Sequence, residues 1–401
     1  MTFSRLSEYF SQLEATTLRN KMVVILASLF EESDAKDIGK LAYLLQGRVA
    51  PLFEAIEFGM ADKMMMRAIA LGMGIKSETV LQVFKKEGDL GKAVEKLKIK
   101  KSRPKADQPL AEKIKNTYKK LKITDVYEVL YKLATSSGAG SQEIKIKLLA
   151  DLIKEADPLS AKYIVRITLA KLRLGFSDMT MLDALSWMLS GTKEYKAAIE
   201  KAYNVRPDLG FICNTIKTRG MKGLVHVVPK VGTPILMARA ERLSTAEEII
   251  AKVGKCAVEG KLDGFRLQVH FIRKLKAKMS NVKTATQNLN LFGDYSRYVK
   301  LFSRNLEDVT VMYPDIVEGV ITQVQAKEAI FEGEAIAFNP KTGEYLPFQE
   351  TVQRKRKYDI AAMAQKVPLK LIVFDLLYLD GISYIDRPFH ERRIRLEKTV
   401  H

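Results

Sequence analysis

Residues 259–266 read Glu-Gly-Lys-Leu-Asp-Gly-Phe-Arg, and they lie in the second part of the chain, past the change of pattern near Gly223. Short runs rich in β-branched and aromatic residues surround turn-forming dipeptides after this point, which is typical of strands. The runs cover residues 265–271, 299–302, 329–338 and 370–378. We therefore predict an α+β domain, mostly antiparallel, over residues 224–401.

The residues before 224 follow a different rule, because apolar side chains recur there at the three- and four-residue spacing of a helix face. Two such faces are formed by Leu6, Tyr9, Phe10 and Leu13 and by Ile144, Leu148, Leu149 and Leu152. Glycine and proline separate the helical stretches, and strand-like alternation is almost absent. The sequence predicts an all-helical domain over residues 1–223.

The composition excludes several classes of protein. Lys and Arg number 66 against 47 Asp and Glu, a net charge of +19, and residues 1–230 hold +13 of it (39 − 26). Such an excess is typical of proteins that bind a polyanion. No apolar run approaches the roughly 20 residues of a membrane-spanning helix. With only two cysteines, a disulfide framework is excluded and a cytoplasmic location is expected.

Two segments are densely basic. Residues 91–122 carry 12 Lys and Arg against three acidic side chains, and residues 273–300 carry seven against Asp294 alone. Either segment can be a solvated surface that binds nothing. For the first, a nucleic-acid contact is an equal alternative; for the second, we expect a solvated insertion loop.

Residues 259–266 also carry the pattern K-x-D-G-x-R, which suits covalent nucleotidyl transfer. This chemistry needs an unprotonated amine, and burial or a neighbouring cation lowers the pKa of a lysine. Lys261 is the candidate amine and Arg266 the candidate cation, which would also hold an α-phosphate. Gly264 would let the backbone approach a nucleotide. An ordinary charged turn is the alternative, since the four fixed residues match by chance about once in a hundred such chains.

Three further motifs follow in order: Phe302-Ser303-Arg304-Asn305, Phe331-Glu332-Gly333-Glu334-Ala335 and Val373-Phe374-Asp375-Leu376-Leu377-Tyr378. With the Lys261 motif, they resemble motifs I, Ia, III and IIIa of the ATP-dependent DNA ligases. The helical half resembles the DNA-binding domain of the archaeal and eukaryotic replicative branch. Its matching stretches are residues 47–51, 140–145, 172–175, 203–205 and 208–210.

The resemblance implies roles for particular side chains. Lys261 would take AMP from ATP as a phosphoramide, and Arg266 would position the nucleotide and later the nicked end. The other implied contacts are Glu259 with the adenine, Glu334 with the ribose hydroxyls, Phe374 stacked on the adenine, and Arg304 with the ribose and a substrate phosphate. Taken singly, Glu334, Phe374 and Arg304 are each more typical of an ordinary strand or surface position, and only their joint order favours the roles.

The resemblance also implies ATP and Mg²⁺ (or another divalent cation) as cofactors and nicked double-stranded DNA as the substrate. It favours a monomer with a sliding clamp as a candidate partner and with no membrane contact.

A glycine loop in the helical half is a candidate DNA contact. Residues 136–140 lead into Ser141, which we expect to cap a helix that starts near Gln142. Backbone N–H groups and the dipole at a helix start favour phosphate. The DNA-binding residues that the loop and the resemblance imply are Gly138, Gly140, Ser141, Lys145, Lys147 and Arg173. An ordinary capped helix is the alternative.

The family pattern continues past motif IIIa, and this sequence shows no counterpart of motifs IV and V or of the C-terminal OB-fold. We expect a fragment of a longer ligase whose second domain is incomplete. By itself, the fragment should bind DNA but seal nicks poorly or not at all. Two rivals stay open. An RNA ligase or capping-type nucleotidyltransferase shares K-x-D-G, although the helical domain argues against it; the other rival is a catalytically inactive DNA-binding remnant.

Overall fold

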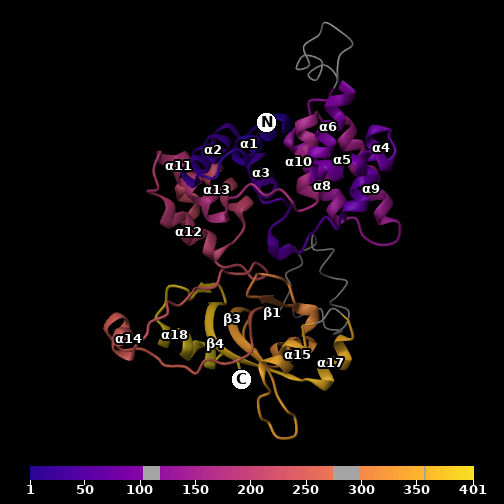
Figure 1. Cartoon of the computed structure of the whole chain (residues 1–401). Helices are drawn as coiled ribbons and strands as arrows, with labels where there is room; N and C mark the ends of the chain where they lie inside the picture. Colours follow the sequence, from indigo (N-terminus) through magenta and orange to yellow (C-terminus); the bar gives the residue numbers. More distant parts are fainter. Residues whose placement is uncertain (103–117, 274–297, 356–357) are drawn as a thin grey trace. The chain divides into compact units, whose positions relative to one another are not determined.

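The computed structural model describes residues 1–102, 118–273, 298–355 and 358–401 (Figure 1). It divides into two compact units, one of residues 1–203 and 208–227 and the other of residues 204–207 and 228–401. Much of both basic segments singled out above lies outside the described residues. No helix within the described ranges is long and apolar enough to cross a membrane.

The first unit is helical, as the apolar spacing predicts. Its helices are α1 (Phe3–Glu14), α2 (Arg19–Glu32), α3 (Ile38–Leu45), η1 (Leu52–Glu54), α4 (Asp62–Met73), α5 (Ser77–Glu87), α6 (Leu90–Ser102), α8 (Ile123–Thr135), α9 (Ser141–Glu155), α10 (Pro158–Thr168), α11 (Asp178–Ser190), α12 (Lys196–Val205) and α13 (Leu209–Leu224). Leu6, Phe10 and Leu13 of α1 are fully buried, which confirms the first predicted face, whereas Ile144 of the second predicted face is 49% exposed. Helix α10 is buried along its length and packs against α1 and α6.

The second unit contains a five-stranded antiparallel sheet with strand order β2-β1-β3-β4-β5. The strands are β1 (Phe265–Ile272), β2 (Tyr298–Ser303), β3 (Glu328–Ala337), β4 (Leu369–Leu379) and β5 (Ile382–Ser383). The helices are α14 (Ala246–Val253), η3 (Thr310–Met312), α15 (Pro314–Gln323), α16 (Phe348–Val352), α17 (Ile360–Lys366) and α18 (Phe389–Glu397). The four longer strands match the predicted runs to within one residue at each end, so the α+β prediction is confirmed.

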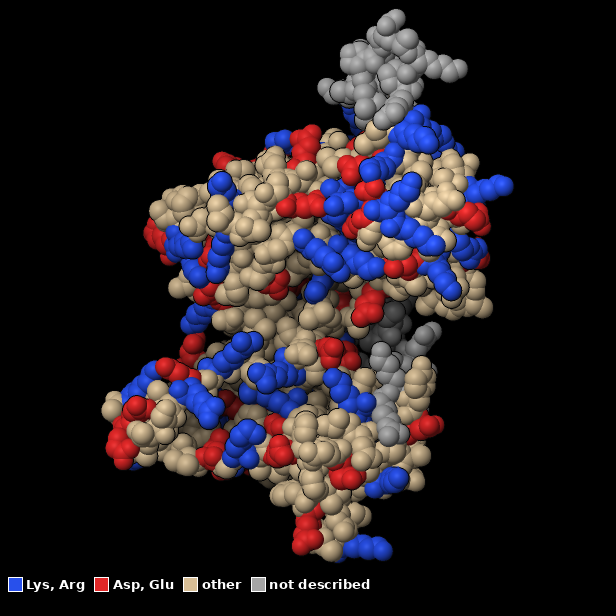
Figure 2. Space-filling model, viewed as in Figure 1, with Lys and Arg blue, Asp and Glu red and all other residues tan. Residues whose placement is uncertain are grey.

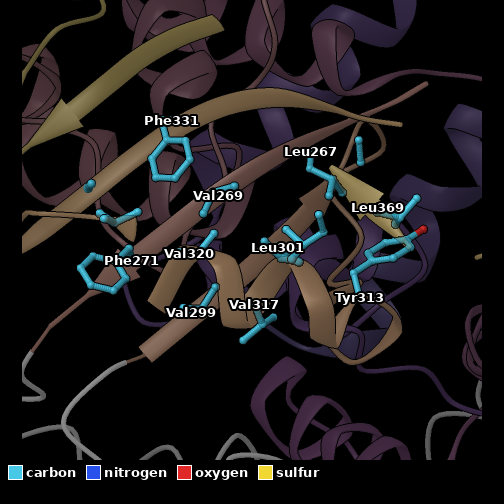
Figure 3. Packing of buried hydrophobic residues seen from close by; sticks show 14 of the residues in the cluster. Leu267, Val269, Phe271, Val299, Leu301, Tyr313, Val317, Val320, Phe331 and Leu369 are labelled. Carbon is cyan, nitrogen blue, oxygen red and sulfur yellow. The ribbon is translucent and has the colours of Figure 1, made fainter. Parts of the chain in front are cut away.

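The main core of this unit lies on one face of the sheet. Leu267, Val269 and Phe271 alternate along β1 and point into it, together with Val317 and neighbouring apolar residues of α15 (Figure 3). Because successive strand residues point to opposite faces, the residues between them face the other way. The second face of β1 therefore carries the polar residues of the Lys261 motif and its continuation.

A half-buried polar cluster ties α1 to α10 in the helical unit. Glu14 Oε2 accepts hydrogen bonds from Lys162 Nζ and Tyr163 OH, each at 2.8 Å, and Oε1 lies 3.0 Å from Nη1 of Arg166. Arg166 also pairs with Asp89 at 3.2 Å. Burial by itself raises the pKa of Glu14, but the hydrogen bonds outweigh it and lower the pKa to about 2.

We expect Glu14→Gln to lower the free energy of unfolding by about 2 kcal/mol near pH 7, since it leaves two buried cations with less counter-charge. The carboxylate's contribution is complete above its ordinary pKa of 4.5 and is lost as the pH falls toward about 2. The difference in the free energy of unfolding between wild type and variant, measured by urea unfolding, should therefore shrink as the pH falls from 4.5 toward about 2.

Glu155→Gln is the matched control, because Glu155 pairs with Lys119 on the surface, with side chains 45% and 63% exposed. We expect it to change the free energy of unfolding by less than about 0.5 kcal/mol. A wild-type-to-Glu14→Gln difference that stays constant from pH 7 to pH 2 would contradict the role of the Glu14 charge.

Candidate functional site

The antiparallel register of β1 and β3 brings residues of two predicted motifs together. Arg266 of β1 lies opposite Glu334 of β3, and Gln268 lies opposite Glu332. Directly opposed residues of an antiparallel pair project to the same face. These four side chains therefore share the face of the sheet that is turned away from the main core.

Gly264 allows this register at the start of β1. A Cβ at this position would lie 2.3 Å from the carbonyl oxygen of Ala335, a distance that no side chain tolerates. The predicted reason for this glycine was close approach to a nucleotide, whereas the structure places the close approach between two strands. The Gly264 N–H also donates a hydrogen bond to the Glu334 carboxyl.

Arg266 is held by two neighbours on this face. Its Nη2 forms an ion pair with Glu332, and its guanidinium carbon lies 5.2 Å from the ring centroid of Phe374, within cation–π range. Phe374 is an extra residue in β4, at a register shift opposite the step from Glu332 to Gly333. Such a bulge re-aims a side chain. The bulge places the ring of Phe374, from motif IIIa, beside the guanidinium of Arg266, from motif I.

One donor of Arg266 is unused. Its Nε is buried and has no hydrogen-bond partner among the described residues. An unpaired buried donor is costly unless an acceptor satisfies it. A phosphate oxygen is a suitable acceptor for a guanidinium.

The Glu334 carboxyl is half-buried and feels both cations of the motif. Burial raises its pKa, while the Gly264 N–H and the charges of Arg266 and Lys261 act in the opposite direction, and the net shift is upward. Lys261 is thus within electrostatic reach of Glu334. The structure brings together Arg266, Glu334 and Phe374, whereas Lys261 is joined to them only through the effect of its charge on the pKa of Glu334.

Lys261 and Glu259 lie in the irregular segment 254–264 and are exposed. Lys261 is therefore not activated by burial in this structure, and the second route, activation by the neighbouring cation Arg266, stays a prediction. Within the described part of the chain, no hydrogen bond or ion pair joins Glu259 to the other site residues.

A pocket opens beside Arg266. Arg304, in the turn after β2, lines it together with Arg266, Gln268, Glu332 and Ile235. The structure therefore places both predicted phosphate-binding arginines on one pocket, and it leaves Glu259, Lys261, Glu334 and Phe374 outside the lining. Among the residues that the structure describes, no group of three or more His, Cys, Asp or Glu could hold a metal ion.

Three buried polar residues of this face have no role in the predicted site: Gln268, His270 and Glu332. Their exposed fractions are 5%, 0% and 4%. A signal was present, because Arg266, Gln268 and His270 follow the two-residue spacing of one strand face. Alternation alone does not say which face is buried, so the sequence could not identify these residues as a buried group.

The glycine loop before α9 is open, but Ser141 does not cap the helix. Gly138 and Gly140 have φ of 87° and 79°, and a Cβ built on either would meet nothing within 4 Å. Gly140 occupies the N-cap position and no side chain caps the helix. The prediction of a Ser141 cap is wrong, because α9 begins one residue earlier, at Ser141 itself.

The two lysines of α9 have different surroundings. Lys145 is buried and its Nζ donates to the carbonyl oxygen of Phe58 at 2.7 Å, whereas Lys147 is exposed. Residues two apart on a helix point about 200° apart, so both cannot face one ligand. Lys145 orders the segment around Phe58, and Lys147 presents surface charge. Arg173 is also exposed and has φ of 47°.

Comparison with known proteins gives a consistent result. The family model described as "DNA ligase N terminus" matches residues 2–186, and the one described as "ATP dependent DNA ligase domain" matches residues 291–401. A "Probable DNA ligase" of Dictyoglomus thermophilum is 44% identical over 400 residues, and a "DNA ligase" of Staphylothermus marinus is 40% identical over 405. Each comparison covers this whole chain but only 62% and 64% of the relatives. The chain thus spans less than two thirds of their length.

We expect Gly264→Ala to lower the free energy of unfolding by about 1–3 kcal/mol, because its Cβ would overlap the Ala335 carbonyl and force β1 away from β3. Gly260→Ala is the matched control, since a Cβ there would meet nothing within 4 Å. Urea unfolding of the full chain measures both. Equal stability of the two variants would show that the β1–β3 approach does not depend on the missing Cβ.

Proposed function

We propose that this chain, which is similar to DNA ligases over its whole length, takes part in sealing nicks in duplex DNA through an AMP–lysine intermediate at Lys261. The observation that carries the proposal is the arrangement around Arg266. Its unpaired Nε, the nearby Phe374 ring and the opposed Glu334 carboxyl lie on one face. This set offers a partner to the phosphate, the base and the ribose of a nucleotide.

The proposed reaction has three transfers. Lys261 Nζ attacks the α-phosphorus of ATP, so that a P–N bond forms while the bond to pyrophosphate breaks. AMP then passes to a 5′-phosphate at the nick, and a 3′-hydroxyl displaces it to join the strands. Apart from Lys261, the protein contributes position and charge. A divalent cation such as Mg²⁺ would neutralise the departing pyrophosphate.

The polar face supports a division of roles. Arg266 would hold the α-phosphate and Arg304 a second phosphate at the same pocket. Glu334 would accept the ribose hydroxyls, and Phe374 would offer the adenine the ring face that Arg266 does not cover. Glu259 would contact the adenine once the exposed segment 254–264 closes on the nucleotide.

DNA binding is proposed mainly for residues 1–223. The open glycine loop before α9 leaves backbone uncovered, and Lys147 and Arg173 are exposed cations. Lys and Arg side chains are spread over the face drawn in Figure 2, with acidic side chains among them. Backbone contacts of this kind read no sequence, which suits a protein that must act at any nick. A monomeric state, a sliding-clamp partner and a cytoplasmic location stay predictions.

We expect Lys261→Ala and Lys261→Arg to abolish labelling of the chain by radioactive ATP and magnesium. Alanine has no amine, and the guanidinium of arginine stays protonated. Lys255→Ala, which changes an exposed lysine six residues away, should keep the label. Mass spectrometry of the labelled chain locates the adduct, and AMP found on another lysine would remove Lys261 from the mechanism.

We expect DNA affinity to fall steeply as salt rises, with each neutralised phosphate adding about −0.9 to the log–log slope. Lys147→Ala and Arg173→Ala should each make that slope shallower by about 1. Lys341→Ala, in an exposed turn of the second unit, should leave it unchanged. Binding by the full chain that is flat between low and moderate salt would contradict an electrostatic interface.

Substrate and labelling assays separate the rival functions. Sealing of nicked RNA in preference to nicked DNA would favour an RNA ligase. DNA binding by a wild-type chain that ATP never labels would favour a non-catalytic DNA-binding protein.

A further inference from the structure

A buried chain of hydrogen bonds runs from Arg266 to the segment that follows the helical unit in the sequence, residues 228–237. We propose that Gln268 is a positioning residue for Arg266, and that it transmits the docking of this segment to the nucleotide pocket. The inference rests on the proposed function of Arg266 and deepens it, because it names what sets the orientation of the arginine.

Gln268 uses its whole amide in this chain. Its Oε1 accepts a hydrogen bond from Ile235 N at 2.7 Å, and its Nε2 donates to Ile235 O at 3.0 Å. The same Nε2 donates to Glu332 Oε1 at 3.1 Å, which leaves Glu332 Oε2 for Arg266. Since a backbone N–H meets one end of the amide and a backbone carbonyl meets the other, Gln268 cannot flip while Ile235 stays in place.

His270 adds a second link to the same segment. Its Nδ1 accepts a hydrogen bond from Gly232 N at 3.1 Å, so that Nε2 carries the proton and donates to Gln268 Oε1 at 3.0 Å. Burial lowers the pKa of His270 to about 3, which keeps the ring neutral. Both acceptor positions of Gln268 Oε1 are therefore filled.

Apolar packing holds the segment against this face of the sheet. Val231 and Ile235 form a small core cluster with Ile272, Tyr298 and Ile330. Ile235 also lines the pocket beside Arg266. The segment thus covers one side of the polar face. It also holds Gln268, which is joined to Arg266 through Glu332.

The arrangement has a mechanical consequence. If residues 231–235 left the sheet, Gln268 would lose both backbone partners and could rotate, and Glu332 would lose the donor on Oε1. Glu332 is 4% exposed, so it would then turn to the nearest remaining cation, Arg266, with both oxygens. The arginine would be drawn from the pocket, and its Nε would no longer face a phosphate.

The test compares AMP labelling of the full chain by radioactive ATP and magnesium across variants. We expect Gln268→Met, which keeps the length of the side chain without donors or acceptors, to slow labelling about 10- to 100-fold. The ATP concentration at half-maximal rate should change less than about threefold, because Phe374 and Glu334 are untouched. A residue needed only for folding would lower the final amount of labelled chain and leave the rate constant of labelling unchanged.

Two further variants keep the test decisive. His270→Phe preserves a buried ring but removes both nitrogens, so it should slow labelling in the same direction even if Gln268→Met does not fold. Thr351→Val is the control: it removes a fully buried hydroxyl that accepts from Ala337 N at 3.0 Å, outside the Arg266 chain. It should label at the wild-type rate.

A double-mutant cycle with Arg266→Lys tests the route through the arginine. If Gln268 acts through Arg266, the double variant should label no more slowly than Arg266→Lys alone. Additive losses would overturn the inference, as would wild-type rates for both Gln268→Met and His270→Phe. A wild-type chain that ATP never labels would instead overturn the proposed function, and the inference with it.

Discussion

The close approach of β1 to β3 at Gly264 is the constraint on which the second unit depends. Because the Ala335 carbonyl occupies the space of a side chain at Gly264, the two strands pair in a single register. A slip of one residue would turn every side chain of β1 to the opposite face. In the observed register, Arg266 meets Glu334, and the apolar residues Leu267 and Val269 enter the core.

The same pairing gives the sheet two faces of opposite character. One face packs α15 against apolar strand residues, as in an ordinary antiparallel sheet. The other buries Gln268, His270 and Glu332, and this is stable because their polar atoms are paired with one another, with the backbone or with Arg266. Among the described residues, the Nε of Arg266 is the buried donor of this network that has no partner, and it is available to a ligand.

In the helical unit, positive charge serves two different purposes. Lys162 and Arg166 surround the Glu14 carboxylate and join helices, and Lys145 holds a backbone carbonyl. Lys147 carries its charge at the surface. The net charge of this half is therefore an upper limit on the positive charge that is available to bind a polyanion, because some of these cations form ion pairs and hydrogen bonds inside the protein.

The sequence by itself determined the helical first half, the antiparallel second half and the identity of the Lys261, Arg304 and Phe374 motifs, because periodicity and short motifs are local properties. It did not determine the position of the α9 cap, the burial of Lys145 or the network behind Arg266. Those depend on which strand face is covered and on partners distant in the chain, such as Ile235 against Gln268. Only tertiary packing decides burial, and burial decides whether a polar side chain binds a ligand or its own protein.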